Sequence, residues 1–160
     1  MLLTSDGTAL TGLYPETHRR PATDWHDSEL PLFETCRAQL EEYFAGERRT
    51  FELPLGPAGT EFQKRVWAQL LAIPFGETRS YGQLAKELGD PNLSRAVGAA
   101  NGANPISVIV PCHRVIGSSG AATGYAGGLE LKEALLAHER RVLREGPCAF
   151  VSEQGQTALF

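Results

Sequence analysis

Cysteine is scarce in this sequence, and its spacing excludes several classes of protein. The 160 residues contain only Cys36, Cys112 and Cys148. Three cysteines cannot all pair, which excludes a complete disulfide framework, and their wide spacing matches no zinc-binding pattern. We therefore expect a cytoplasmic protein with reduced thiols and no bound metal.

Long hydrophobic runs are also missing. No apolar stretch approaches the roughly 20 residues that a membrane-spanning helix needs, and residues 1–7 contain no Lys or Arg of the kind that opens a signal peptide. The apolar and charged fractions, 42% and 21%, are those of an ordinary globular protein. We expect no membrane partner, and a chain long enough for one core or for two small domains that share it.

Basic residues are outnumbered, and the net charge of −4 at first argues against a nucleic-acid partner. Residues 1–59 hold five basic and ten acidic side chains, whereas residues 60–144 hold ten basic and seven acidic ones. The basic second half is weak evidence for a phosphate-binding face, since a solvated surface gives the same excess.

The first part of the chain predicts a small unit of strands and one helix. A β-hairpin is indicated over residues 2–13, where Ser5-Asp6-Gly7 separates two apolar runs. Residues 31–44 have helical spacing, with Cys36 on the apolar stripe, which favours a packing role for this thiol. The less regular segments are a loop over 18–27, an edge strand over 51–55 and a linker over 56–59. The predicted domains are 1–56 and 57–147, followed by a tail over 148–160.

Two capping boxes, Thr60–Gln63 and Ser80–Gln83, mark helix starts in the second part. A further helix is predicted over 91–101, and with the helix before it forms a helix-turn-helix pattern. Apart from Arg95 this helix has mostly small residues, so it can approach a partner surface closely, although tight helix–helix packing explains it equally well. The helix that begins near Thr60 should bury Phe62, Val66, Trp67, Leu70 and Leu71.

The stretch around Cys112 holds the clearest candidate for chemistry. Residues 106–110 are apolar and rich in β-branched side chains, which predicts a buried strand that Pro111 ends. A thiol followed by His113 and Arg114 has cations beside it that stabilise the reactive thiolate. The alternative is a small buried cysteine without a reaction. Neighbours on an extended chain point apart, so a direct contact between Cys112 and His113 would need a water or a bent backbone.

The glycine-rich segment 117–128 lacks phosphate-loop spacing, which argues against a nucleotide site. It suits a loop that wraps a ligand, with Tyr125 as its one large side chain. A last helix is predicted over 129–143, and Glu139 falls on its apolar stripe. A buried carboxylate needs a partner, and His113 or an arginine is the obvious candidate, unless Glu139 forms a salt bridge at the helix end.

The motifs now assembled resemble those of the O6-alkylguanine-DNA alkyltransferase family. The resemblance is close over residues 60–140 and loose before that. It rests on the Cys112 motif, on Asn104-Pro105 before it and on segments at 62–63, 81–85, 95–98, 124–128 and 135–139. It implies an α+β fold, with a small N-terminal β-sheet and helix domain before a helical C-terminal domain that carries a winged-helix-like helix-turn-helix for DNA.

The resemblance implies single-turnover transfer of an alkyl group from O6-alkylguanine, and from O4-alkylthymine, to Cys112, without a cofactor. His113 is implied as a base acting through a water, and Glu139 as the carboxylate that orients the imidazole. Asn104 would order the Cys112 loop, and Tyr81 would protonate N3 of the departing guanine. A thioether has no hydrolytic exit, so the protein would be consumed.

The same resemblance implies the groups around a guanine that has left the base stack. The carbonyls of Cys112 and Val115 would accept from its exocyclic amine, and the Ala126 N–H would meet O6. Tyr125 would line the alkyl pocket, and Arg114 is also expected in the substrate site.

The implied partner is double-stranded DNA, bound through its minor groove with little sequence specificity. Arg95 would replace the flipped nucleotide in the stack, and Ser94, Ala96 and Ala99 would lie against the groove. A monomer is expected in solution, with self-association on DNA left open. Two features of the family have no counterpart here. One is a further strand that usually precedes the first hairpin, and the other is the set of metal ligands found in some relatives.

Three alternatives stay open from the residues alone. The first is a protein of the same fold that recognises alkylated bases without repairing them, against which the presence of Cys112 argues. The second is a thiol hydrolase that uses Cys112, His113 and Glu139. The third is a plain helix-turn-helix regulator, for which residues 91–101 carry too few long polar side chains.

Overall fold

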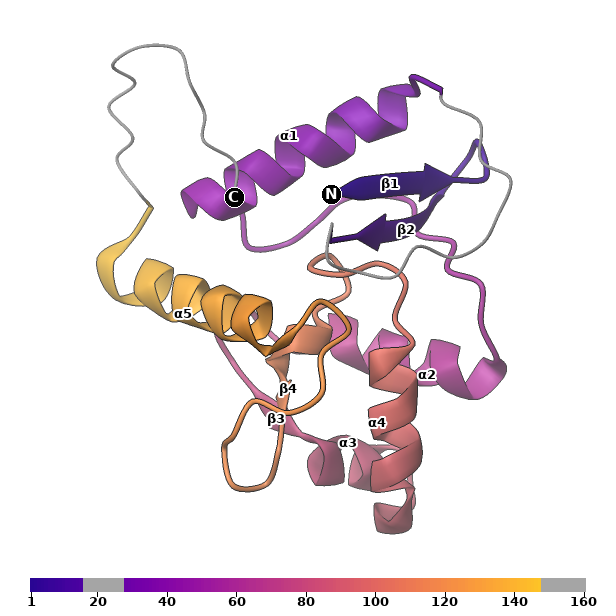
Figure 1. The fold of residues 1–160 in the computed structure, drawn as a ribbon, viewed down its shortest axis with the longest axis vertical. Coiled ribbons are helices and arrows are strands. Elements are labelled where there is room, and N and C mark those ends of the chain that lie inside the picture. Colours follow the sequence, from indigo (N-terminus) through magenta and orange to yellow (C-terminus); the bar gives the residue numbers. More distant parts are fainter. Residues whose placement is uncertain (16–27, 148–160) are drawn as a thin grey trace.

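The structure, a computed structural model, describes residues 1–15 and 28–147. It has the expected α+β class: a hairpin and one long helix form the first part, and helices around a cysteine-bearing loop form the second (Figure 1). No helix in the described ranges is long and apolar enough to cross a membrane. The loop predicted over 18–27 and the tail predicted over 148–160, with Cys148, lie outside the described residues.

The predicted hairpin is present as β1 (Leu2–Ser5) and β2 (Leu10–Tyr14), which pair antiparallel. Asp6 closes its turn, because the carboxylate accepts hydrogen bonds from the backbone N–H groups of Thr8 and Ala9, each at 2.8 Å. The outer edge of β2 bonds to two distant segments. Leu10 forms a bridge with Leu55, and Leu13 forms one with Ile106. The hairpin thus contacts the segment that leads to Cys112.

The predicted edge strand over 51–55 is wrong, since only Leu55 forms a bridge there. The side chain of Gln39 replaces a strand partner. It donates to the Glu52 carbonyl at 3.0 Å and accepts from the Glu52 N–H at 2.8 Å. Pro54, which has no N–H, prevents a regular ladder from continuing.

The long helix of the first part is α1 (Pro31–Ala45), which begins at Pro31 as expected and ends at Gly46 with φ 82°. Its buried face includes Cys36, Leu40 and Tyr43. This face packs into one continuous core with residues of the hairpin, α2, the cysteine loop and the last helix. The thiol of Cys36 is therefore part of the core, as its place on the stripe predicted.

Both capping boxes form as predicted, and they begin α2 (Glu61–Leu71) and α3 (Tyr81–Glu87). The expectation that α2 buries Leu71 is wrong, because this side chain is 50% exposed at the helix end. After Gly89 a short 3₁₀ turn, η1 (Pro91–Leu93), leads into α4 (Ser94–Gly102). Helices α3 and α4 form the predicted helix-turn-helix (Figure 1).

The strand predicted over 106–110 is wrong beyond its first residue. Ile106 forms the bridge to Leu13, and the chain then folds into tight turns, in which the Val110 N–H donates to the Ile106 carbonyl at 3.0 Å. Val108 is buried and has φ 71°, a conformation rare for a β-branched residue. A run of apolar side chains indicates burial, whether the backbone is a strand or a series of turns. Here the backbone forms tight turns, and these turns lead to Cys112.

Three further elements complete the second part. The 3₁₀ turn η2 (Cys112–Arg114) leads into β4 (Val115–Ile116), which pairs parallel with β3 (Arg79–Ser80). Helix α5 (Leu129–Glu145) packs on η2. Because α3 starts directly after β3, the short β3–β4 pair brings Tyr81 close to the chain that follows Cys112.

Candidate active site

The thiol of Cys112 lies at the start of η2, where it is only 4% exposed. Asn104 holds the loop around it. Its Nδ2 lies 3.0 Å from the Cys112 Sγ and donates to the Val110 carbonyl at 2.9 Å, while its Oδ1 accepts from the Ile106 N–H at 3.0 Å. A second amide, that of Asn101 at the end of α4, donates to the Cys112 carbonyl at 3.4 Å. Two asparagines therefore fix the position of the thiol.

Burial and nearby polar groups have opposite effects on the pKa of the Cys112 thiol. Burial raises the pKa of the thiol, whereas the hydrogen bond from Asn104 and the positive charge of Lys132 act to lower this pKa. Because burial is the larger effect, the thiol is protonated at rest and needs a base to become a nucleophile.

The imidazole of His113 is fully buried, and its Nε2 lies 2.8 Å from Oε1 of the fully buried Glu139. Burial would raise the pKa of Glu139, but hydrogen bonds from His113 and Arg114 outweigh it and hold this pKa at about 2. An ionised carboxylate only accepts hydrogen bonds, so Nε2 must carry the proton that it donates. The lone pair of His113 is then on Nδ1, a buried atom without a hydrogen-bond partner in the described part of the chain.

Burial also sets the charge of this imidazole. It lowers the pKa of His113, an effect that Glu139 opposes and that the charge of Arg114 reinforces. A neutral imidazole with one free lone pair is a proton acceptor, and it lies next to Cys112 in sequence.

Glu139 has more partners than the sequence indicated. Arg114 donates through Nε and Nη2 to its carboxylate, at 3.0 Å and 2.9 Å, and through Nη1 to the Ile73 carbonyl at 2.6 Å. The Gly76 N–H donates to Oε2 at 2.8 Å, and the Tyr43 hydroxyl donates to Oε1 at 2.8 Å. The expectation of a buried, paired Glu139 is confirmed by this geometry. The guanidinium of Arg114 is directed to protein atoms, and the substrate contact expected of it stays a prediction.

A second group of contacts joins Tyr81 to the glycine-rich loop. The Tyr81 hydroxyl donates to the Thr123 carbonyl at 3.1 Å. The fully buried Lys132 of α5 donates from Nζ to the same carbonyl at 2.7 Å and to the Val115 carbonyl at 2.5 Å. Sequence reasoning missed Lys132, and its only signal was a long cation among buried positions of α5.

The Tyr125 hydroxyl is buried in the described part of the chain. Burial raises the pKa of this phenol, and the nearby Cys112 raises it further, so the hydroxyl lies beside the thiol. The next residue, Ala126, is exposed on the same loop.

Helix α4 presents a face of small residues to solvent. Arg95, Ala96 and Ala99 are exposed, and Ser94 is half-buried at the start of the helix. The opposite face is buried against α2, where the Trp67 indole N–H donates to the Ala100 carbonyl at 2.8 Å. Only one exposed side chain of this face, that of Arg95, is long.

Comparisons with known proteins decide which family carries this arrangement. Residues 61–141 match the model of the 6-O-methylguanine DNA methyltransferase DNA-binding domain, and residues 1–57 match the ribonuclease-like domain of the same family. The chain belongs to the 6-O-methylguanine DNA methyltransferase family.

Relatives in this family align over most of the chain. A methylated-DNA–protein-cysteine methyltransferase of Methanosarcina acetivorans is 58% identical over 112 residues, which is 70% of this chain and 71% of that protein. One of Mycobacterium tuberculosis strain H37Rv is 49% identical over 142 residues, covering 88% and 86%. The crystal structure of Mycobacterium tuberculosis OGT in complex with DNA matches with a TM-score of 0.80 at 50% identity, covering 86% of this chain and 85% of that one.

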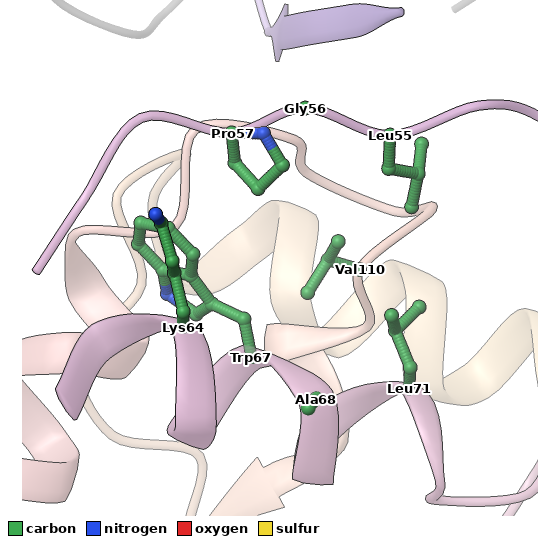
Figure 2. Close-up of a pocket in the computed structure, with 8 residues that line it drawn as sticks. All are labelled: Leu55, Gly56, Pro57, Lys64, Trp67, Ala68, Leu71 and Val110. Atoms are coloured by element: carbon green, nitrogen blue, oxygen red, sulfur yellow. The ribbon is translucent and has the colours of Figure 1, made fainter. Parts of the chain in front are cut away.

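One hollow of this family member lies apart from the thiol. A groove of about 490 Å³ runs between α2 and the segment before it (Figure 2). Val110 is its only residue from the cysteine loop, and the Cys112 side chain does not line it. It is lined by Leu55, Gly56, Pro57, Lys64, Trp67, Ala68, Leu71 and Val110.

Proposed function

We propose that this family member repairs DNA by one irreversible transfer, in which an alkyl group moves from O6 of guanine to Sγ of Cys112. The bond between the alkyl carbon and Sγ forms as the bond to O6 breaks. The thiol loses a proton, and the departing guanine gains one at N3. The observation that carries the proposal is a buried thiol held by Asn104, next to a neutral imidazole whose lone pair is free, in a chain of this family.

His113 acts as the base for the thiol. Glu139 holds the proton on Nε2, so Nδ1 receives the proton from Cys112, and we place one water between the two groups. As His113 becomes an imidazolium, the carboxylate 2.8 Å from Nε2 stabilises its charge. Arg114 supports this step by holding Glu139.

Tyr81 protonates the leaving guanine. Its hydroxyl points at the Thr123 carbonyl at rest, 3.1 Å away, and turns to N3 of the flipped base. The Cys112 and Val115 carbonyls accept from the exocyclic amine. The Val115 carbonyl has a second lone pair for this contact beside the one that Lys132 occupies.

The exposed glycine-rich loop covers the other side of the base. The Ala126 N–H donates to O6. Because this contact comes from the backbone, an alanine at this position is sufficient for it. The ring of Tyr125 lines the space for the alkyl group, which its closeness to the Cys112 thiol supports.

DNA lies on α4. Ser94, Ala96 and Ala99 meet the minor groove, where small residues allow a close approach, and Arg95 enters the stack in place of the flipped nucleotide. The exposure of Arg95, Ala96 and Ala99 on one face supports this placement. We expect a cytoplasmic monomer in solution that accepts O4-alkylthymine as well, with self-association on DNA left open.

The test is intact-mass measurement after the protein is mixed with excess duplex that carries one O6-methylguanine, followed by peptide mapping. We expect a gain of one methyl on Cys112 and no further gain, with Cys112→Ser retaining duplex binding but gaining nothing. Tight binding without a mass change in the native protein would instead indicate recognition without repair. Neither binding nor a mass change would refute the proposal and turn attention to hydrolase substrates.

A further inference from the structure

Tyr43 belongs to the first part of the chain, yet it contacts Glu139, the carboxylate that holds the candidate base His113. It is fully buried in the last turn of α1. Its hydroxyl donates at 2.8 Å to Oε1 of Glu139, the same oxygen that lies 2.8 Å from Nε2 of His113. One carboxylate oxygen therefore connects α1 to the imidazole.

We propose that Tyr43 is a positioning residue for the alkyl transfer, which holds Oε1 of Glu139 and limits how strongly that oxygen attracts the His113 proton. The proposal rests on the proposed function, because it assigns His113 as the base. It gives the first domain a part in the chemistry beyond its packing.

The phenol is held in place by more than its hydrogen bond. Rings lie 5.1 Å, 5.5 Å and 5.8 Å away, on Phe44, Phe51 and Phe75 respectively. The ring of His138 lies 5.2 Å away, and its Nε2 is 2.9 Å from the Tyr43 carbonyl. This enclosure leaves the hydroxyl few directions other than toward Glu139.

The phenol can only donate in this arrangement. Burial, reinforced by the charge of Glu139, raises the pKa of Tyr43 well above its ordinary value, so the hydroxyl keeps its proton. Each donor on Oε1 draws electron density away from that oxygen. The Tyr43 hydroxyl therefore weakens the carboxylate as an acceptor for His113, and removing it should make His113 more basic.

Other charges near the imidazole are fixed and would not mask this effect. Arg114 donates to the same carboxylate, and both Arg114 and Lys132 lower the pKa of His113 through their positive charges. Burial is the larger cause of that lowering. The Tyr43 hydroxyl adds no charge of its own, and it donates to Oε1, the oxygen that faces His113, whereas the other uncharged donor outside the imidazole, the Gly76 N–H, binds Oε2.

The experiment follows the single-turnover rate of methyl transfer from an O6-methylguanine duplex against pH, in the full chain. For Tyr43→Phe we expect the acidic limb of the profile to move toward higher pH by about half a unit to one unit. The plateau should fall about three- to tenfold, because the carboxylate is less well fixed. Duplex affinity should not change.

Phe51→Leu is the matched control, since it loosens the same aromatic cluster without removing a donor. It should lower the melting temperature and leave the pH profile in place. A second variant carries 3-fluorotyrosine instead of Tyr43, a stronger donor of similar shape, and should move the acidic limb the opposite way, to lower pH.

A profile for Tyr43→Phe that superimposes on the native one would overturn the inference and leave a packing role. If Tyr43→Phe does not fold, the fluorinated variant decides alone, and an unmoved limb overturns the proposal. Failure of the native protein to transfer methyl at all would instead refute the proposed function, so the two failures are distinct.

Discussion

Replacing Glu139 by Gln exchanges one carboxylate oxygen for an NH₂ group, and it should lower both the stability of the protein and its rate of alkyl transfer. The carboxylate is fully buried and accepts hydrogen bonds from His113, Arg114, Tyr43 and Gly76. An amide has one acceptor end and one donor end. Whichever way it turns, its NH₂ group faces N–H or O–H donors, and the buried guanidinium loses its counter-charge.

The expected loss follows from these contacts. Breaking a buried ion pair by removing one partner costs about 3–5 kcal/mol, a large part of the roughly 5–15 kcal/mol that holds a typical domain folded. The rate should fall as well, because an amide NH₂ can donate to Nε2 of His113 and move the imidazole proton to Nδ1. That removes the lone pair meant for the thiol of Cys112, which should slow the transfer about 10²–10⁴-fold.

Urea unfolding at neutral pH measures the first loss, and single-turnover transfer from an O6-methylguanine duplex measures the second. Glu133→Gln is the matched control, since Glu133 is exposed on the same helix, and it should change stability by no more than about 0.5 kcal/mol. If Glu139→Gln lost less than about 1 kcal/mol and kept the native rate within about threefold, the view of Glu139 as an essential buried anion would be wrong.

Two further predictions concern DNA and acid. Arg95→Ala should slow repair of a duplex about tenfold or more, because the flipped state costs a few kcal/mol, yet hardly affect reaction with the free O6-methylguanine base. Arg37→Ala, an exposed cation on α1, is its control, and equal losses on both substrates would reject the role of Arg95. Acid should lower the free energy of unfolding in two pH ranges. The folded pKa of His113 is lowered, so stability falls as pH drops below about 6.5, its ordinary pKa. The folded pKa of Glu139, about 2 against 4.5, adds a loss of about 3 kcal/mol between those values, and urea titrations at several pH values should show both.

Local signals with a physical mechanism predicted the helices well. The capping boxes at Thr60 and Ser80 set the starts of α2 and α3, because the side-chain contacts that define them involve residues only three positions apart. Glu139 could be recognised as special because a carboxylate on an apolar stripe needs a partner. The pattern could not say which partners it has.

The failures have a common cause in side-chain hydrogen bonds that the composition of a segment does not reveal. Residues 106–110 have the composition of a strand, but Asn104 binds their backbone and holds them in turns. Gln39 does the same for the segment around Glu52. Tyr43 was predictable as a buried residue of a helix, whereas its bond to a carboxylate 96 positions away depends on how α1 packs.

The hydrogen bond from Asn101 to the Cys112 carbonyl also bears on engineering. The helix that we propose to present Arg95 to DNA ends with a contact to the backbone of Cys112, so α4 cannot be exchanged as an independent DNA-binding element. A graft that replaced α4 to alter DNA preference would also remove one of the two amides that seat the thiol, unless an asparagine is kept at this position. The proposed DNA-binding surface and the position of the thiol therefore depend on the same segment, and a redesign must treat residues 94–112 as one unit.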